Sequence, residues 1–254
     1  MENMRKPFQG VWNIVRFNWH FYVLSIGALL ILFVFSNFTN SIFSIYLFIV
    51  GVLIFLPTFI SLSVSYYVYD LSGLYNLNWI ANSITTEKSS IVNINAGFDE
   101  TSILLKGKFP NSELVVFDFY DPKKHTEVSI KRARKAYALF PNTKSVTTNK
   151  LPTLDNSADK IFVIFAAHEI RNEQERIEFF KELKRVLKPT GEIYITEHLR
   201  DVPNFLAYNI SFLHFYSKQT WLQTFRLAEL TLKSKQKTTP FISTFTLTKY
   251  GFAS

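Results

Sequence analysis

The sequence predicts a doubly wound, mostly parallel α/β sheet that follows an N-terminal transmembrane helical hairpin. Two observations lead to this prediction. The window from Phe17 to Tyr69 contains no Asp, Glu, Lys or Arg, although the chain carries a net charge of +8. After residue 90, short apolar runs alternate with amphipathic helical patterns, which is typical of a parallel sheet covered on both faces.

The uncharged window contains two apolar stretches, at about residues 21–38 and 42–64, with a short polar turn between them. Because roughly 20 apolar helical residues cross the hydrocarbon core, each stretch is long enough to span a bilayer. Core helices of a soluble domain would show a polar face, and a second span does not normally follow a cleaved signal peptide at once. We therefore assign residues 1–69 to a membrane anchor and residues 70–254 to a soluble domain.

Charges beside the spans predict their orientation. Arg5, Lys6 and Arg16 precede the first span, and the turn between the spans carries no positive charge. Positive residues stay on the cytoplasmic side. We therefore expect a multi-pass protein of the inner (cytoplasmic) membrane, with both termini and the soluble domain in the cytoplasm. The lipid bilayer is its first expected partner, and anionic headgroups would attract the basic soluble domain.

Composition excludes several kinds of chemistry. The chain has no cysteine, which excludes disulfides, thiolate metal sites and Cys nucleophiles. No HxxxH or HExxH spacing occurs, so we expect no metal. No nucleic-acid recognition motif accompanies the basic charge, and we expect no nucleic-acid partner.

The soluble domain is predicted to contain seven strands. The first five are expected at residues 91–95, 114–119, 145–148, 161–166 and 192–197, with helices at 99–106, 126–139 and 172–187 between them. An aromatic-rich helical segment is expected at 202–230. Two strand-like runs, 230–235 and 241–250, are expected to close the sheet as a hairpin.

Four segments resemble the class I S-adenosylmethionine-dependent methyltransferases. They are Ile91–Asp99 at the place of the glycine-rich loop, Val116–Asp118, Leu151-Pro152 with Asp155, and Phe180–Gly191 with its Arg-Val-Leu-Lys-Pro run. The resemblance covers about residues 70–250. It implies a Rossmann-like methyltransferase fold and S-adenosylmethionine as cofactor.

In this family the cofactor lies at the carboxyl ends of the strands, where a glycine turn lets backbone N–H groups approach it. The resemblance assigns Asp118 to the ribose hydroxyls, and a helix cap or turn residue is the alternative for this side chain. The cofactor-binding residues that it implies are Asn93, Asn95, Gly97, Asp118, Phe119, Thr148 and Ala166.

The glycine-rich loop departs from the common pattern. Asn95 and Asp99 stand where that pattern has glycine, and Thr147 stands where an Asp is usual. A side chain at position 95 restricts the backbone, and Asp99 would bring negative charge toward the cofactor's carboxylate. A non-catalytic methyltransferase-like membrane scaffold or assembly protein that has lost cofactor binding is therefore the alternative.

Candidate catalytic residues follow the fourth and fifth strands. They are His168, Glu197 and His198, together with His214 in the aromatic segment. Histidine titrates near neutrality and suits general-base catalysis. A helix cap or a core residue with one hydrogen bond is the alternative for each histidine.

Together these features predict a membrane-anchored S-adenosylmethionine-dependent methyltransferase. We expect a hydrophobic small-molecule or lipid-like acceptor, because the aromatic segment 202–221 lies where the family commonly shapes the acceptor pocket. O-methylation is the expected reaction. The sequence leaves open a homo-oligomer or a membrane partner, and also an α/β domain that binds a different nucleotide.

Overall fold

The computed structural model describes residues 5–80 and 89–250. Within them the chain forms a seven-stranded sheet in the order β3-β2-β1-β4-β5-β7-β6. The strands are β1 Ser90–Asn95, β2 Glu113–Asp118, β3 Lys144–Ser145, β4 Ala158–Ile164, β5 Leu187–His198, β6 Thr231–Lys237 and β7 Ile242–Thr248. β1 to β5 pair in parallel, and β7 runs antiparallel to both β5 and β6. The predicted mostly parallel sheet is confirmed.

Helices cover both faces of this sheet. They are α4 Ser102–Lys108, α5 Val128–Ala136, α6 Glu173–Val186, α7 Val202–Tyr208 and α8 Lys218–Leu227, with shorter turns η2 Leu74–Asn76, η3 Ala167–Glu169 and η4 Asn209–His214. On one face Phe179 of α6 and Trp221 of α8 join the main core. On the other face Leu105 of α4 packs with Leu77 and Ile80.

Two local predictions were wrong. The third strand spans two residues, Lys144 and Ser145, rather than 145–148. The helix expected over 202–230 is broken into α7, η4 and α8. Asn209, whose φ is 50°, ends α7, and the Ser217 hydroxyl caps α8 by accepting a hydrogen bond from the Thr220 amide.

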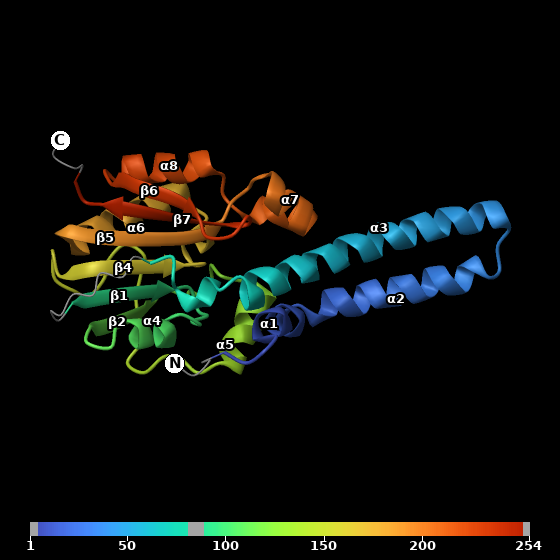
Figure 1. Cartoon of the computed structure of the whole chain (residues 1–254), viewed down its shortest axis with the longest axis horizontal. Coiled ribbons are helices and arrows are strands. Elements are labelled where there is room, and N and C mark those ends of the chain that lie inside the picture. Colours follow the sequence, from blue (N-terminus) through green and yellow to red (C-terminus); the bar gives the residue numbers. More distant parts are fainter. Residues whose placement is uncertain (1–4, 81–88, 251–254) are drawn as a thin grey trace.

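The N-terminal segment forms α1 Gln9–Phe17, α2 Trp19–Ser36 and α3 Ser41–Tyr66, which continues as the π-helix η1 Tyr67–Leu71. We call α2 and α3 the apolar hairpin. It projects from one end of the α/β domain (Figure 1). Both helices are long and apolar enough to cross a membrane, and the apolar windows within them contain no buried residue. The observed helices extend the predicted spans by one to two residues at most of their ends, while α2 stops at Ser36.

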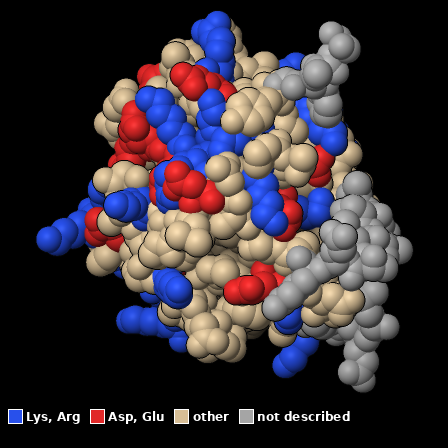
Figure 2. All heavy atoms as spheres, turned by 90° about the vertical axis from the view of Figure 1, so that its left-hand side faces the viewer, with Lys and Arg blue, Asp and Glu red and all other residues tan. Residues whose placement is uncertain are grey.

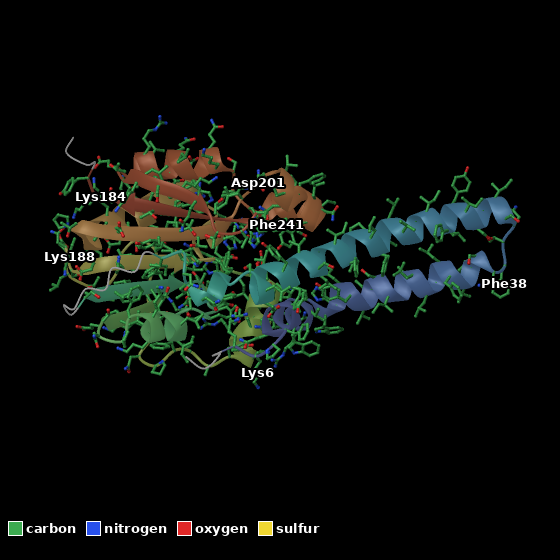
Figure 3. All side chains as sticks on the ribbon, viewed as in Figure 1. Lys6, Phe38, Lys184, Lys188, Asp201 and Phe241 are labelled. Carbon is green, nitrogen blue, oxygen red and sulfur yellow. The ribbon has the colours of Figure 1, made fainter. Side chains whose placement is uncertain are left out.

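The hairpin faces the carboxyl ends of the parallel strands. Asp201, which follows β5, lies at the end of the domain beside the hairpin, and Lys188, near the start of β5, lies at the far end (Figure 3). That far end exposes Lys and Arg interspersed with Asp and Glu (Figure 2). The two ends of the molecule are therefore opposite in polarity.

The base of the hairpin is fixed to the domain by specific contacts. Asp70 accepts hydrogen bonds from the backbone N–H groups of Gly10 and Val11, at 2.8 Å each, and so caps α1. A Cβ at Gly10 would lie 2.4 Å from the Tyr69 Cβ, so only glycine permits this approach. Arg132 of α5 donates to the Phe17 carbonyl at 2.6 Å. These contacts bring the hairpin base against the sheet edge.

Candidate active site

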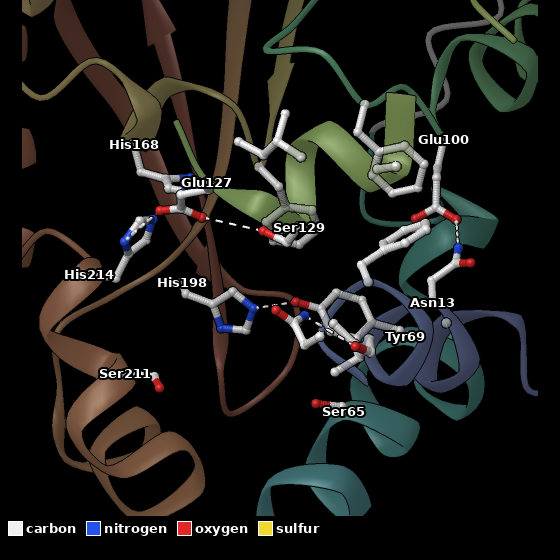
Figure 4. A pocket seen from close by; sticks show the side chains of 18 of the residues that line it. Asn13, Ser65, Tyr69, Glu100, Glu127, Ser129, His168, His198, Ser211 and His214 are labelled. Carbon is white, nitrogen blue, oxygen red and sulfur yellow. Dashed lines mark hydrogen bonds and ion pairs between the residues drawn. The ribbon is translucent and has the colours of Figure 1, made fainter. Parts of the chain in front are cut away.

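A pocket of about 590 Å³ lies between the sheet edge and the hairpin base (Figure 4). Its walls come from the loop after β1, the ends of β4 and β5, helix α5, the turn η4, and the three N-terminal helices α1, α2 and α3. The lining residues include Phe98, Thr101, Phe165, His168, His198 and His214, together with Phe21, Tyr22, Ser61 and Ser65 of the apolar hairpin. Three of the four predicted catalytic residues therefore line one pocket.

Glu197, the fourth, lies behind the pocket wall and holds His168. Its carboxylate accepts from the His168 backbone N–H at 3.2 Å and lies 2.7 Å from the ring atom Nδ1. The Glu197 side chain is only 1% exposed. Burial by itself would lower the pKa of His168, but Glu197 and Glu169 outweigh it and raise the pKa to about 10. His168 therefore carries a proton at neutral pH.

His198 is held as a neutral ring. The Asn204 amide group donates hydrogen bonds to Asp201 and to the Phe241 carbonyl, so its Oδ1 must accept a hydrogen bond from His198 Nδ1–H, 2.9 Å away. The other ring nitrogen then accepts from the Tyr69 hydroxyl at 2.7 Å. Burial lowers the pKa of His198 to about 4. His198 therefore positions Tyr69 and has no free nitrogen for the pocket.

His214 lies beside His168 in the pocket wall. Glu169 Oε1 lies 3.2 Å from His168 Nε2 and 3.8 Å from His214 Nε2. Glu127 of the loop before α5 lies 3.3 Å from His214 Nδ1, and the Arg171 guanidinium contacts the same ring. Figure 4 shows Glu127 reaching toward His214 and His168 across the pocket. These side chains come from three separate segments of the chain: Glu127 before α5, residues 168–171 after β4, and His214 of η4.

The residues predicted at the end of β1 and in the loop after it form hydrogen bonds within this segment and with the start of α4. Asn93 donates to the hydroxyls of Thr101 and Ser102, and Asn95 accepts from the Gly97 amide. Asp99 Oδ1 accepts from the first amides of α4, which explains why that helix begins at 102 rather than 99. Gly97 has a φ of 101°, a conformation that side chains rarely adopt.

Asp118 lies at the end of β2, as predicted, but its carboxylate has an internal partner. Arg134 of α5 forms an ion pair with Asp118 and lies over the Tyr120 ring at 4.3 Å. The Tyr120 amide donates to the other Asp118 oxygen at 2.9 Å. The Asp118 side chain is 4% exposed. Any ligand hydroxyl that binds Asp118 must therefore compete with Arg134 for this buried carboxylate.

The remaining three predicted cofactor residues are buried near these groups. Phe119 packs against Phe179 in the core, Thr148 donates to Glu175, and Ala166 directly precedes η3. None of the seven predicted cofactor residues is among those that line the pocket, although Gly97 lies between its lining residues Ala96 and Phe98.

Sequence reasoning missed the residues that the N-terminal segment contributes. Glu100 accepts from Asn13 and Tyr75, at 3.2 and 3.1 Å, and pairs with Arg5. These partners are 25 to 95 residues away in the chain. In the sequence, the only signals of these contacts were Glu100, which lies beside the glycine-rich loop, and Tyr69, which ends the uncharged window.

Comparisons with known proteins agree with this geometry. Residues 115–195 match the model of a methyltransferase domain. A methyltransferase structure from Aquifex aeolicus, described as S-adenosylmethionine-dependent, is 16% identical, with a TM-score of 0.50 over 76% of this chain and 98% of that one. A protein from Pyrococcus horikoshii is 17% identical, with a TM-score of 0.51 over 70% and 89%.

An O-methyltransferase family 2 protein from Planctomyces limnophilus, solved in complex with apigenin, is 12% identical, with a TM-score of 0.51 over 76% of this chain and 61% of that one. No curated protein sequence matches the chain. At these identities, the structural likeness establishes the fold alone. The fold is that of the class I methyltransferases, which confirms the resemblance found in the sequence.

Proposed function

We propose that this chain, which has the class I methyltransferase fold and a segment matching a methyltransferase domain, uses S-adenosylmethionine to methylate a hydrophobic or lipid-like acceptor at a membrane. The observation that supports this proposal most is that the pocket has one wall from the sheet edge and another from the apolar hairpin. Its polar groups come from the ends of β4 and β5, and its other wall includes Phe21, Tyr22 and Ser65 of the apolar hairpin. An acceptor held in a bilayer would reach the polar groups without crossing water.

The residue types around β1 and β2 fit S-adenosylmethionine, the cofactor that the matched domain and the fold imply. Asp118 offers a buried carboxylate for ribose hydroxyls. Asn93 Oδ1, Asn95 Nδ2 and Asp99 Oδ2 are buried and have no hydrogen-bond partner within the described residues. Buried polar atoms without partners are costly, and a polar ligand would satisfy them.

The cofactor, when bound, supplies an electrophilic methyl group on its sulfonium, so the protein mainly has to align the acceptor. We assign His168, which is protonated and held by Glu197, to donate a hydrogen bond to the acceptor oxygen and stabilise its negative charge. Tyr69, whose hydroxyl proton is donated to His198, would accept a hydrogen bond from the acceptor hydroxyl before that hydroxyl ionises. An ionised phenol or carboxylic acid is the acceptor group that this arrangement favours, in agreement with O-methylation.

The test is transfer of label from [methyl-³H]S-adenosylmethionine to a membrane lipid extract by the purified full chain in nanodiscs. We expect label in the organic phase, and a decrease of at least about 10-fold for Glu197→Gln, which removes the charge that holds His168. Glu229→Gln, on the exposed side of the domain, is the matched control and should retain full activity. Thermal unfolding of each variant verifies its folding.

The alternative function, a non-catalytic scaffold, is favoured by one observation: Arg134 occupies the Asp118 carboxylate. A scaffold would neither transfer label nor bind S-adenosylhomocysteine. Methyl transfer to any component of the extract excludes this alternative.

The membrane anchor is tested separately. We expect the full chain to stay in the membrane pellet after carbonate and high salt, and to be released by detergent. The chain has no cysteine, so single substitutions report orientation cleanly. In spheroplasts of the expression host, a membrane-impermeant maleimide should label Asn37→Cys in the hairpin turn and should not label Lys188→Cys on the far end of the domain. The reverse labelling would contradict the cytoplasmic placement.

A further inference from the structure

The fold brings together three potential metal ligands that the sequence separates. Ligand atoms of His168, Glu169 and His214 all lie within 4.8 Å of one another. His168 and Glu169 belong to η3 after β4, and His214 ends η4. His168 and His214 are 46 positions apart in the sequence, which matches no short metal-binding motif. The sequence alone therefore predicted no metal and could not reveal this cluster.

The distances within the cluster suit a transition metal. A tetrahedral site with metal–ligand bonds of about 2.0–2.1 Å places its ligand atoms about 3.3 Å apart. Glu169 Oε1 lies 3.2 Å from His168 Nε2 and 3.8 Å from His214 Nε2. The two pairs that involve Glu169 are therefore within about 0.5 Å of this spacing, and the third pair, His168 with His214, lies within 4.8 Å.

The orientation of His168 is the second, independent feature. Glu197 engages Nδ1 at 2.7 Å and leaves Nε2 directed at Glu169 and His214. Metal-binding histidines almost always have this arrangement, in which a carboxylate or carbonyl holds the ring nitrogen that does not bind the metal. Because Glu197 is itself buried at the end of β5, the ring is fixed before any ion arrives.

The charges around the cluster favour a cation. Glu127, Glu169 and Glu197 converge on the two imidazoles, and the basic group in contact with His214 is Arg171. The hydrogen bonds of Arg171 to His214 are solvent-exposed, so its guanidinium can turn away into water. An ion would then take its place against the ring.

We propose that His168, Glu169 and His214 bind a divalent transition-metal ion of the Zn²⁺ type, with an open coordination position facing the pocket. The role of this ion rests on the proposed function: the ion would displace the proton of His168 Nε2, bind the acceptor oxygen in place of that N–H group, and favour the ionised form of the acceptor. The binding site itself does not depend on that function.

The test uses the full chain in detergent, stripped with EDTA and titrated with ZnSO₄ by calorimetry and with Co²⁺ by visible absorption. We expect one equivalent to bind, with a Co²⁺ band typical of a site containing nitrogen ligands. His214→Gln and Glu169→Gln should each weaken Zn²⁺ binding by more than about 100-fold, and Glu197→Gln by about 10–100-fold. His20→Gln, outside the cluster, is the matched control and should bind as the unaltered chain does.

Arg171→Ala supplies a variant that does not remove a ligand. If Arg171 competes with the ion for His214, Zn²⁺ should bind several-fold more tightly to this variant. Absence of Zn²⁺ and Co²⁺ binding in both the unaltered chain and Arg171→Ala overturns the proposal, as does equal binding in His214→Gln.

Calorimetry with S-adenosylhomocysteine on the same samples separates this proposal from the methyltransferase function. Binding of S-adenosylhomocysteine without Zn²⁺ overturns the metal site alone. Binding of one Zn²⁺ without S-adenosylhomocysteine supports the metal site and contradicts the proposed methyltransferase.

Discussion

The two halves of the sheet edge differ in what their polar side chains contact. Around β1 and β2 these groups bind one another: Asp118 pairs with Arg134, and Asp99 caps α4. Around β4 and β5, His168 and Tyr69 line an open pocket. The unusual Asn and Asp of the β1 loop therefore have structural roles here, and cofactor binding depends on whether Arg134 leaves Asp118.

The largest expected effect is a loss of folding stability at acidic pH, and it arises at His198 in the β4–β5 half of the sheet edge. Burial lowers the pKa of His198 to about 4, against about 6.5 for an unfolded histidine. Between about pH 6.5 and 4 the unfolded chain binds a proton at His198 and the folded chain does not. The free energy of unfolding is therefore highest above pH 6.5 and falls as the pH decreases toward 4. The loss is about 3 kcal/mol.

Unfolding of the detergent-solubilised chain at pH 7.5, 5.5 and 4.5 measures this loss. Other acidic groups titrate in the same range, so the comparison is with His198→Gln, which should lack this part of the pH dependence. Parallel curves for the two proteins would show that His198 does not control the stability of this half.

A smaller effect is expected where the hairpin base meets the domain. In Gly10→Ala the new Cβ would lie 2.4 Å from the Tyr69 Cβ and force α1 away from η1. We expect a loss of about 1–3 kcal/mol in unfolding free energy. Gly27→Ala in α2 is the matched control, because its Cβ meets nothing within 4 Å. Equal unfolding temperatures for the two variants would contradict the close packing of Tyr69 against α1.

The smallest effect tests the β1–β2 half directly. Arg134→Gln removes the cation that competes for Asp118, and its side chain is 29% exposed, so the ion pair is partly screened. We expect S-adenosylhomocysteine to bind about 5-fold more tightly, corresponding to about 1 kcal/mol. Calorimetry provides the measurement. Weaker binding in this variant would mean that Arg134 holds the cofactor instead of excluding it.

The fold was predictable from the sequence because apolar periodicity is a local property. The runs at 91–95 and 161–166 are observed as β1 and β4, and the helix predicted at 172–187 is observed as α6, with Asn172 as its cap. His168, His198 and Glu197 were predictable for the same reason, since each directly follows or ends a strand.

The rest of the site was not predictable because it arises from long-range contacts. Asp70 caps a helix that begins 60 residues earlier, and Tyr69 meets His198 across 129 positions. The ion pair of Arg134 with Asp118 depends on how α5 packs against the sheet, and no spacing rule encodes it. The contacts of Thr148 with Glu175 and of Phe119 with Phe179 likewise depend on how α6 packs against the sheet.

The central claim is that this chain binds its cofactor through Asp118, and calorimetry with S-adenosylhomocysteine tests it most directly. The purified full chain should bind one equivalent, and Asp118→Asn should bind at least about 10-fold more weakly, because the charge-assisted hydrogen bonds to ribose are lost. Asp155→Asn, on an exposed loop, is the control and should bind normally. Equal binding by Asp118→Asn, or no binding even when Arg134 is replaced by Gln, would contradict the claim.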